Sequence, residues 1–165
     1  MTSNLFTAAL IALVVLAGCK DRAAASAEQG APQTGLAVEQ ITIDTERGPV
    51  ALTVELAQTG PQIQKGLMFR EQMARDSGML FLFADEDERA FYMKNTLIPL
   101  DMVFIRKSGV IQSIHENARP LDETSIFSHG PAAAVLELNG GASRELGLKA
   151  GQTVRHRFFG NALAR

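Results

Sequence analysis

From Val38 onward, short apolar runs alternate with clusters of Gly, Pro, Asn and charged residues. Along Val50–Ala57, apolar side chains occupy every second position, which is the period of a strand with one buried and one solvated face. The preceding segment Val38–Thr45 ends at the turn residues Glu46–Pro49, so the two segments predict a β-hairpin. This pattern is typical of a mainly β domain.

Later apolar runs predict six more strands, which makes about eight in all. Met79–Phe83 is continuously apolar and too short for an independent helix, which favours a strand buried on both faces. The six strands are expected at Met79–Phe83, Ala90–Asn95, Leu100–Ile105, Val110–Asn117, Pro131–Leu138 and Thr153–Phe159. One or two short helices, one starting near Thr59 and one at Ala142–Leu146, complete the expected sandwich or barrel-like sheet.

The N-terminal end carries an export pattern. Leu5–Leu16 is a largely apolar run of 12 residues. As a helix it is too short for a bilayer core of about 30 Å, so it is typical of a signal peptide. It leads into Leu16-Ala17-Gly18-Cys19, which resembles the lipobox of bacterial lipoproteins. The resemblance implies removal of residues 1–18 and acylation of Cys19; an uncleaved short anchor and a plain secretory signal are the alternatives.

The next segment is rich in Ala, Gly, Gln, Ser and Pro, and it has no apolar period. It predicts a flexible tether over residues 19–36, followed by a single domain over residues 37–162. Two or three acyl chains would hold such a domain stably at a membrane. Lys20, in place of Asp after the cysteine, resembles an outer-membrane sorting signal. We therefore expect a lipid anchor on the periplasmic face of a bacterial membrane, inner or outer.

Charge and composition limit the classes of partner and cofactor that we expect. The net charge is −2 without a cationic cluster, which argues against nucleic acid as a partner. Cys19 is the only cysteine, so no internal disulfide can form. The three histidines, His115, His129 and His156, lie in separate segments without the short spacing of zinc ligands. The methionines are spread singly through apolar strands and are expected in the core. We expect neither a metal nor another cofactor.

Seven segments between Val50 and Val154 resemble, in order, the domain-of-unknown-function 192 family. The strongest are E-L-A-x-T-x6-G-L-M-x-R (Glu55–Arg70), G-M-L-F-x-F (Gly78–Phe83), F-Y-M-K-N-T-L-I-P-L-D (Phe91–Asp101), V-L-E-L-N-x-G (Val135–Gly141) and G-L-K-A-G-Q-T-V (Gly147–Val154). The resemblance implies a mainly β, exported or membrane-tethered protein. The family has no established activity, so it assigns no catalytic residue.

The most polar stretch between two apolar strands is Met93–Asp101. Its side chains could rim a cleft for an anionic or polyhydroxyl ligand, together with the aperiodic loop Arg119–Gly130. The candidate ligand-binding residues are Arg70, Lys94, Asn95, Asp101 and His115. In the structural alternative, Asn95 and Asp101 bond backbone groups around a turn and Lys94 is solvated.

These features favour a non-enzymatic binding module for a small polar ligand or an envelope partner. A hydrolase acting on an envelope polymer is the alternative, since a carboxylate pair such as Asp101 with Glu116 can serve glycoside hydrolysis. An assembly factor for an envelope complex is a third possibility. Ser128 and His129 adjoin, but the G-x-S-x-G pattern of a nucleophilic serine is absent from the sequence.

Overall fold

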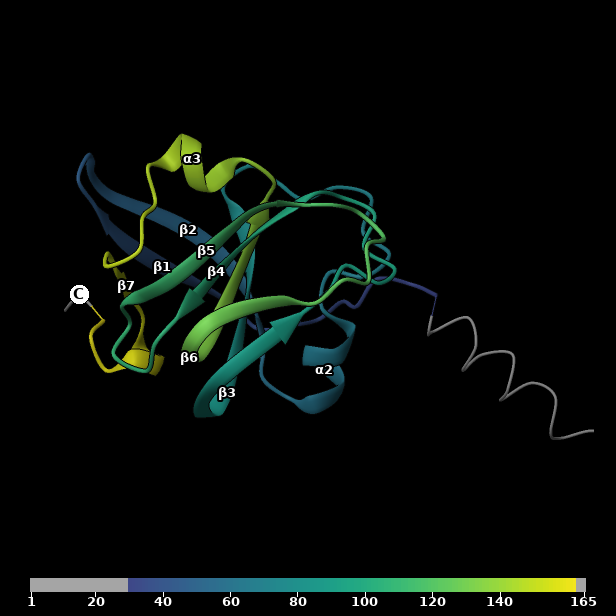
Figure 1. Cartoon of the computed structure of the whole chain (residues 1–165), viewed down its shortest axis with the longest axis horizontal. Coiled ribbons are helices and arrows are strands. Elements are labelled where there is room, and N and C mark those ends of the chain that lie inside the picture. The colour runs from purple at the N-terminus through teal and green to yellow at the C-terminus, as the bar shows by residue number, and fades with distance from the viewer. Residues whose placement is uncertain (1–29, 163–165) are drawn as a thin grey trace, which may run out of the picture. The chain divides into compact units, whose positions relative to one another are not determined.

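The computed structural model describes residues 30–162, which form seven strands and three short helices (Figure 1). The strands are β1 (Val38–Thr45), β2 (Gly48–Ala57), β3 (Ser77–Phe91), β4 (Leu100–Ile105), β5 (Ile111–Ala118), β6 (Ile126–Asn139) and β7 (Thr153–Arg155). The helices are α2 (Gly60–Lys65), α3 (Ala142–Leu146) and the 3-10 helix η1 (Arg157–Phe159). The expected signal run and Cys19 lie outside the described residues. No helix within residues 30–162 is long and apolar enough to cross a membrane.

All seven strands belong to one sheet, in the order β5-β4-β6-β3-β2-β1-β7. Only β2 and β3 pair in parallel, and α2 lies in the connection between them. The sheet curls until its two ends meet: Val110 bridges Thr153, and the Ile111 N–H donates to the Gln152 carbonyl at 2.8 Å. The result is the expected mainly β, barrel-like sheet, in the form of a curled half-barrel.

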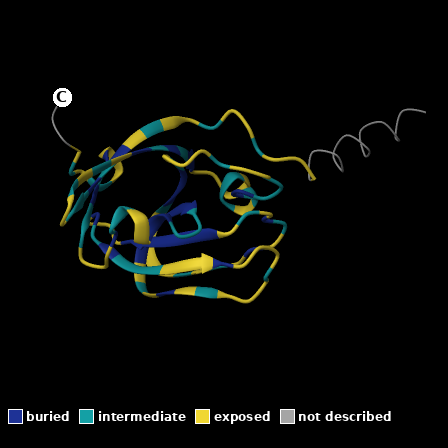
Figure 2. Cartoon of the chain, turned by 90° about the horizontal axis from the view of Figure 1, so that it is seen from above, coloured by how far each residue is buried: buried dark blue, intermediate teal, exposed yellow. Residues whose placement is uncertain are grey.

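The sheet has an apolar cluster on each face. The inner cluster receives residues from all seven strands, including Ile41, Val54 and Val154, which only the concave side of a curled sheet allows. The outer cluster contains Met79, Phe81, Met93, Met102 and Phe104, and is covered by partly buried residues of α2 and of nearby loops. Figure 2 shows the buried residues concentrated along the strands.

Strand β3 supplies both clusters, as its sequence pattern predicted. Met79 and Phe81 enter the outer cluster, while Leu80 and Leu82 enter the inner one. A strand buried on both faces has no polar face, which explains the continuous apolar run.

The largest differences from the expected elements concern β3, residues 92–95, β6 and the last strand. Strand β3 continues through the acidic residues to Phe91, because its backbone pairs with β6 past a register shift. Residues 92–95 are therefore not a strand, and the sheet has seven strands and not eight. Strand β6 begins at Ile126, which shortens the expected loop Arg119–Gly130. The predicted last strand stops at Arg155 and continues as η1. The differences in β3 and β6 follow from long-range backbone pairing, which local side-chain patterns do not encode.

Candidate functional site

A row of side chains crosses five neighbouring strands on the outer face of the sheet. Met102 of β4 is paired with His115 of β5 on one side and with Glu137 of β6 on the other. Glu137 is also paired with Met79 of β3, which is paired with Glu55 of β2. Residues directly opposite each other project to the same face. Glu137 therefore stands between two thioether side chains in the outer cluster.

Glu137 is buried, with 5% of its surface exposed. Among residues 30–162, its carboxyl group has no hydrogen-bond or ion-pair partner. Burial disfavours the charged form and raises the pKa of Glu137 to about 8. Most of the folded protein thus carries the neutral acid at pH 7, which can donate a hydrogen bond as well as accept one.

The Glu137 carboxyl faces a cleft of about 350 Å³ that we call the Glu137 cleft. One wall comes from α2 and the turn after it. The other wall comes from β3, between Phe81 and Phe91, and from Tyr92 and Thr96 in the segment that follows. The cleft is lined by Ile63, Gln64, Lys65, Gly66, Leu67, Met68, Phe81, Phe83, Glu88, Arg89, Ala90, Phe91, Tyr92, Thr96 and Glu137.

Aromatic rings form one side of this cleft. Phe91 meets Phe81 edge to face with the ring centroids 5.2 Å apart, and it meets Phe83 in the same way at 6.4 Å. Gly66 has a φ of +48°, and a Cβ atom there would lie 3.2 Å from the Phe81 ring. The absent side chain at Gly66 lets the end of α2 approach the aromatic wall closely.

The two cationic residues of the cleft already have contacts. The Arg89 guanidinium lies 4.1 Å from the centre of the Phe83 ring, while its Nε donates to the Ala132 carbonyl and its Nη2 binds Asp85. Lys65 Nζ lies 4.7 Å from the centre of the Phe69 ring. Neither cation is paired with Glu137.

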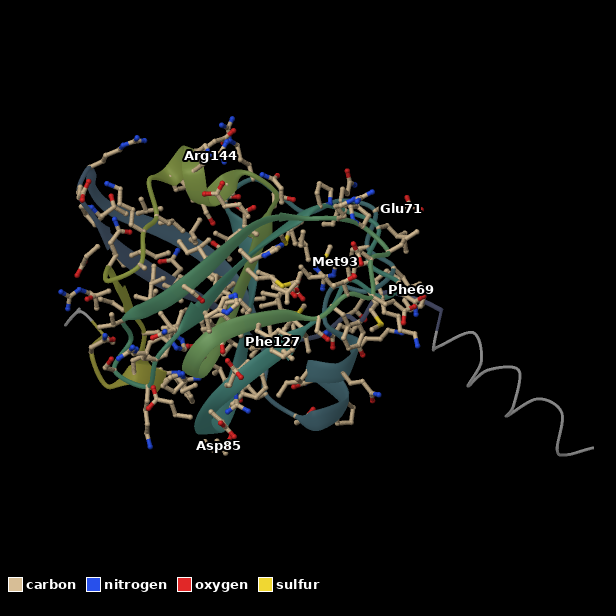
Figure 3. The ribbon with its side chains drawn as sticks, in the orientation of Figure 1. Phe69, Glu71, Asp85, Met93, Phe127 and Arg144 are labelled. Carbon is tan, nitrogen blue, oxygen red and sulfur yellow. The ribbon has the colours of Figure 1, made fainter. Side chains whose placement is uncertain are left out.

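Segment 92–99 separates this cleft from a second groove. Tyr92 and Thr96 line the Glu137 cleft. Met93 instead lines a groove of about 410 Å³, together with residues of β5, of β6 and of the loop between them, including His115, Asn117, Arg119 and His129. The loop is tied to the segment because the Met93 N–H donates to the Asp122 carbonyl at 2.8 Å. In Figure 3, Met93 and Phe69 lie among the loops at one end of the sheet.

Two of the sequence-predicted site residues hold the fold together. Asp101 is fully buried, and its carboxylate accepts the backbone N–H groups of Asn117, Gly141 and Ser143 at 2.7–2.9 Å. Arg70 makes a two-pronged ion pair with Glu55, at 2.7 and 2.6 Å. These contacts occupy the Asp101 carboxylate and both terminal nitrogens of the Arg70 guanidinium.

The other three predicted residues are distributed between a turn and the second groove. Lys94 is exposed, and Asn95 shapes a turn with φ +54° in which its carbonyl accepts the Phe69 N–H at 2.8 Å. His115 is exposed and lines the second groove. None of the five candidates lines the Glu137 cleft, so the structure does not bring them together there. A ligand-binding role for them stays a prediction.

The acid at the base of the cleft was missed by sequence reasoning. Its signal is a single carboxyl inside the apolar run A-A-A-V-L-E-L of β6. A charged residue within a strand that is apolar on both sides is a buried-acid candidate. Within residues 30–162, no group of three or more His, Cys, Asp or Glu residues is placed to hold a metal ion.

The fold and the site together define a mainly β half-barrel with a buried acid at the base of an aromatic cleft. The chain belongs to the DUF192 family (uncharacterized ACR), whose model matches residues 41–156. No curated protein matches the chain significantly.

Two solved structures are similar to the chain. One, from Sinorhizobium meliloti 1021, is described as a candidate transcription regulator; it is 44% identical, with a TM-score of 0.74 over 76% of this chain and 98% of that one. The other, from Novosphingobium aromaticivorans DSM 12444, is of unknown function; it is 40% identical, with a TM-score of 0.73 over 76% of this chain and 89% of that one.

Proposed function

We propose that this protein is a non-enzymatic binding module that holds a small polar ligand in the Glu137 cleft. The observation that carries the proposal is the Glu137 carboxyl itself, which is buried at the cleft without a partner among the described residues. A ligand that hydrogen-bonds Glu137 would supply the partner that this carboxyl lacks among residues 30–162.

The form of the cleft supports a small ligand. Its volume of about 350 Å³ lies within the range of known small-molecule pockets, about 300–1,000 Å³. Apolar and aromatic walls with few polar groups are also the usual composition of such pockets. The aromatic wall would contact the body of the ligand, and Glu137 would orient its polar group.

A ligand screen tests this function directly. Small amines, alcohols, amides and sugars are tested against the full-length protein by ligand-observed NMR, in parallel with a Glu137→Met variant. We expect hits that Glu137→Met, which removes both the donor and the acceptor, weakens at least tenfold and that Glu116→Gln, outside the cleft, leaves within about twofold. Hits that are equally strong in both variants, or no hits at all, contradict the proposal.

A hydrolase acting on an envelope polymer is the second candidate. A carboxyl with a pKa near 8 in a cleft has the property of a general acid at neutral pH. The pair considered from the sequence is less suited, because Asp101 is saturated by backbone N–H groups and Glu116 binds Arg144 at 2.5 Å. Turnover of any glycan or peptide substrate that Glu137→Gln abolishes would favour the hydrolase over the binding module.

We further propose that the protein acts outside the cytoplasm, anchored through acyl chains on Cys19 to the periplasmic face of the inner or the outer bacterial membrane. The support is the sequence pattern Leu5–Leu16 followed by Cys19. Cells grown on labelled palmitate should label the wild-type protein and not Cys19→Ser. Label that persists in Cys19→Ser, or wild-type protein recovered from the cytosol, would exclude the anchor. An assembly factor would be indicated instead by a stable co-purifying envelope protein.

A further inference from the structure

We propose that the ligand of the Glu137 cleft is an organic cation: a small molecule whose ammonium group pairs with ionised Glu137 and lies against the aromatic wall. This inference rests on the binding function proposed above and specifies the class of ligand. Binding breaks the O–H bond of the Glu137 carboxyl, passes its proton to solvent, and leaves an ammonium–carboxylate ion pair. No covalent bond to the ligand forms.

The distribution of charge in the cleft is the first argument. The ionisable residues that line it are Lys65, Glu88, Arg89, Tyr92 and Glu137. Arg89 is engaged by Asp85 and by the Phe83 ring, and Lys65 lies over Phe69. Glu88 is exposed, and His115 is separated from Glu137 by Met102 in the row across the sheet. None of these groups is paired with Glu137, so when its carboxyl ionises a cationic ligand can supply the counter-ion.

The aromatic wall is the second argument. Cations are attracted to the faces of aromatic rings, and this attraction strengthens where water is excluded. The wall already binds one cation in this way, since the Arg89 guanidinium lies 4.1 Å from the centre of the Phe83 ring. Phe81, Phe91 and Tyr92 line the same cleft. An aromatic wall beside an unpaired carboxyl is the chemistry that recognises small ammonium ions.

The affinity of the cleft for a cation should depend on pH through the protonation of Glu137. With a pKa of about 8, about one tenth of Glu137 is ionised at pH 7 and about nine tenths at pH 9. The apparent affinity for a cation scales with the ionised fraction, so it should rise about tenfold between these pH values. A neutral ligand that accepts a hydrogen bond from the protonated acid should show the opposite trend.

Choline and 3,3-dimethylbutan-1-ol are suitable probes, because they have the same shape and differ in a single permanent positive charge. Each is titrated into the full-length protein by calorimetry at pH 6, 7, 8 and 9. Measurements in two buffers of different ionisation enthalpy count the protons released. For choline we expect about a tenfold gain in affinity from pH 7 to pH 9, and release of about 0.9 proton per ligand at pH 7. The alcohol should bind more weakly than choline at pH 9.

Two variants separate the cleft acid from general effects of pH. Glu137→Gln should remove both the gain with pH and the proton release, and should weaken choline binding at least tenfold at pH 9. Glu116→Gln, at an ion pair outside the cleft, should retain the gain and the proton release. The pH profile of the wild-type protein tests the inference even if Glu137→Gln fails to fold.

The binding results for the two probes distinguish the proposed class of ligand from the binding function of the cleft. If the alcohol binds and choline does not, or if choline binds without proton release, the cationic class is wrong while the cleft remains a binding site. If neither probe binds at millimolar concentration, the cationic class is also rejected, and the ligand screen decides the binding function.

Discussion

Asp101 on β4 and Glu137 on β6 are buried acids one position apart on paired strands, and they project to opposite faces of the sheet. Asp101 accepts three backbone N–H groups, whereas Glu137 has no partner among the described residues. Two acids from the same region of the sheet thus have different roles. The first stabilises the connections of β5 and α3 to β4, and the second is available at the cleft.

Replacing Asp101 by alanine should destabilise the protein strongly. The substitution leaves three N–H groups without their carboxylate, and two of them follow β6 at the start of α3. We expect a loss of about 3–5 kcal/mol in the free energy of unfolding, measured by urea denaturation. Glu116→Gln, at an exposed ion pair, should change it by less than about 1 kcal/mol. An unchanged free energy of unfolding in Asp101→Ala would show that Asp101 has no structural role.

The stability of the protein should depend on pH through Glu137. The pKa of this carboxyl is about 8 in the folded state against an ordinary 4.5, so between these values only the folded state retains the proton. The contribution to stability is complete below pH 4.5 and is lost as the pH rises to 8, with a slope of up to about 1.4 kcal/mol per pH unit.

The measurement compares unfolding free energies of wild type and Glu137→Gln from pH 4 to pH 9. The difference should shift in favour of the variant as the pH rises, and it should level off above pH 8. Glu88→Gln serves as the exposed control and should parallel the wild type. A difference that does not change with pH would show that Glu137 is ionised in the folded protein.

The ion pair between Arg70 and Glu55 should stabilise the folded protein. The Arg70 guanidinium is largely buried, with 16% of the side chain exposed, and its two terminal nitrogens bind the Glu55 carboxylate and the Gln33 carbonyl. We expect Arg70→Lys to lose about 1–2 kcal/mol of stability, because lysine cannot make the two-pronged contact. A double-mutant cycle with Glu55→Gln measures the coupling, and a coupling below about 0.3 kcal/mol would contradict the expectation.

Substitutions of Asn95 and of Lys94 should have different effects on the melting temperature. Asn95 has a φ of +54°, which alanine adopts at a cost of about 1 kcal/mol and glycine adopts freely. Asn95→Ala should lower the melting temperature by about 3–5 °C, while Asn95→Gly and the exposed Lys94→Ala should change it little. Loss of ligand affinity in Lys94→Ala or Asn95→Gly without loss of stability would support the ligand-binding role predicted from sequence.

Elements with a local signal were predicted closely from the sequence. Strand β4 and helix α3 have the expected bounds, and the hairpin of β1 and β2 differs only at its turn. Alternation along β2 and the continuous apolar run of β3 both report burial, which is a property of each residue and its near neighbours. The extension of β3 through Asp85–Glu88 had no such signal, because backbone pairing with β6 holds these exposed residues in the sheet.

The candidate site needed the tertiary structure. The sequence by itself determined that polar groups lie among apolar strands, and that one acid interrupts the apolar run of β6. Only the fold decided that Asp101 meets N–H groups 16 to 42 positions away, and that Glu137 meets none among residues 30–162. The physical reason is that strand register sets which distant groups become neighbours. The local pattern therefore does not show whether a buried acid has hydrogen-bond partners, because these come from distant parts of the chain.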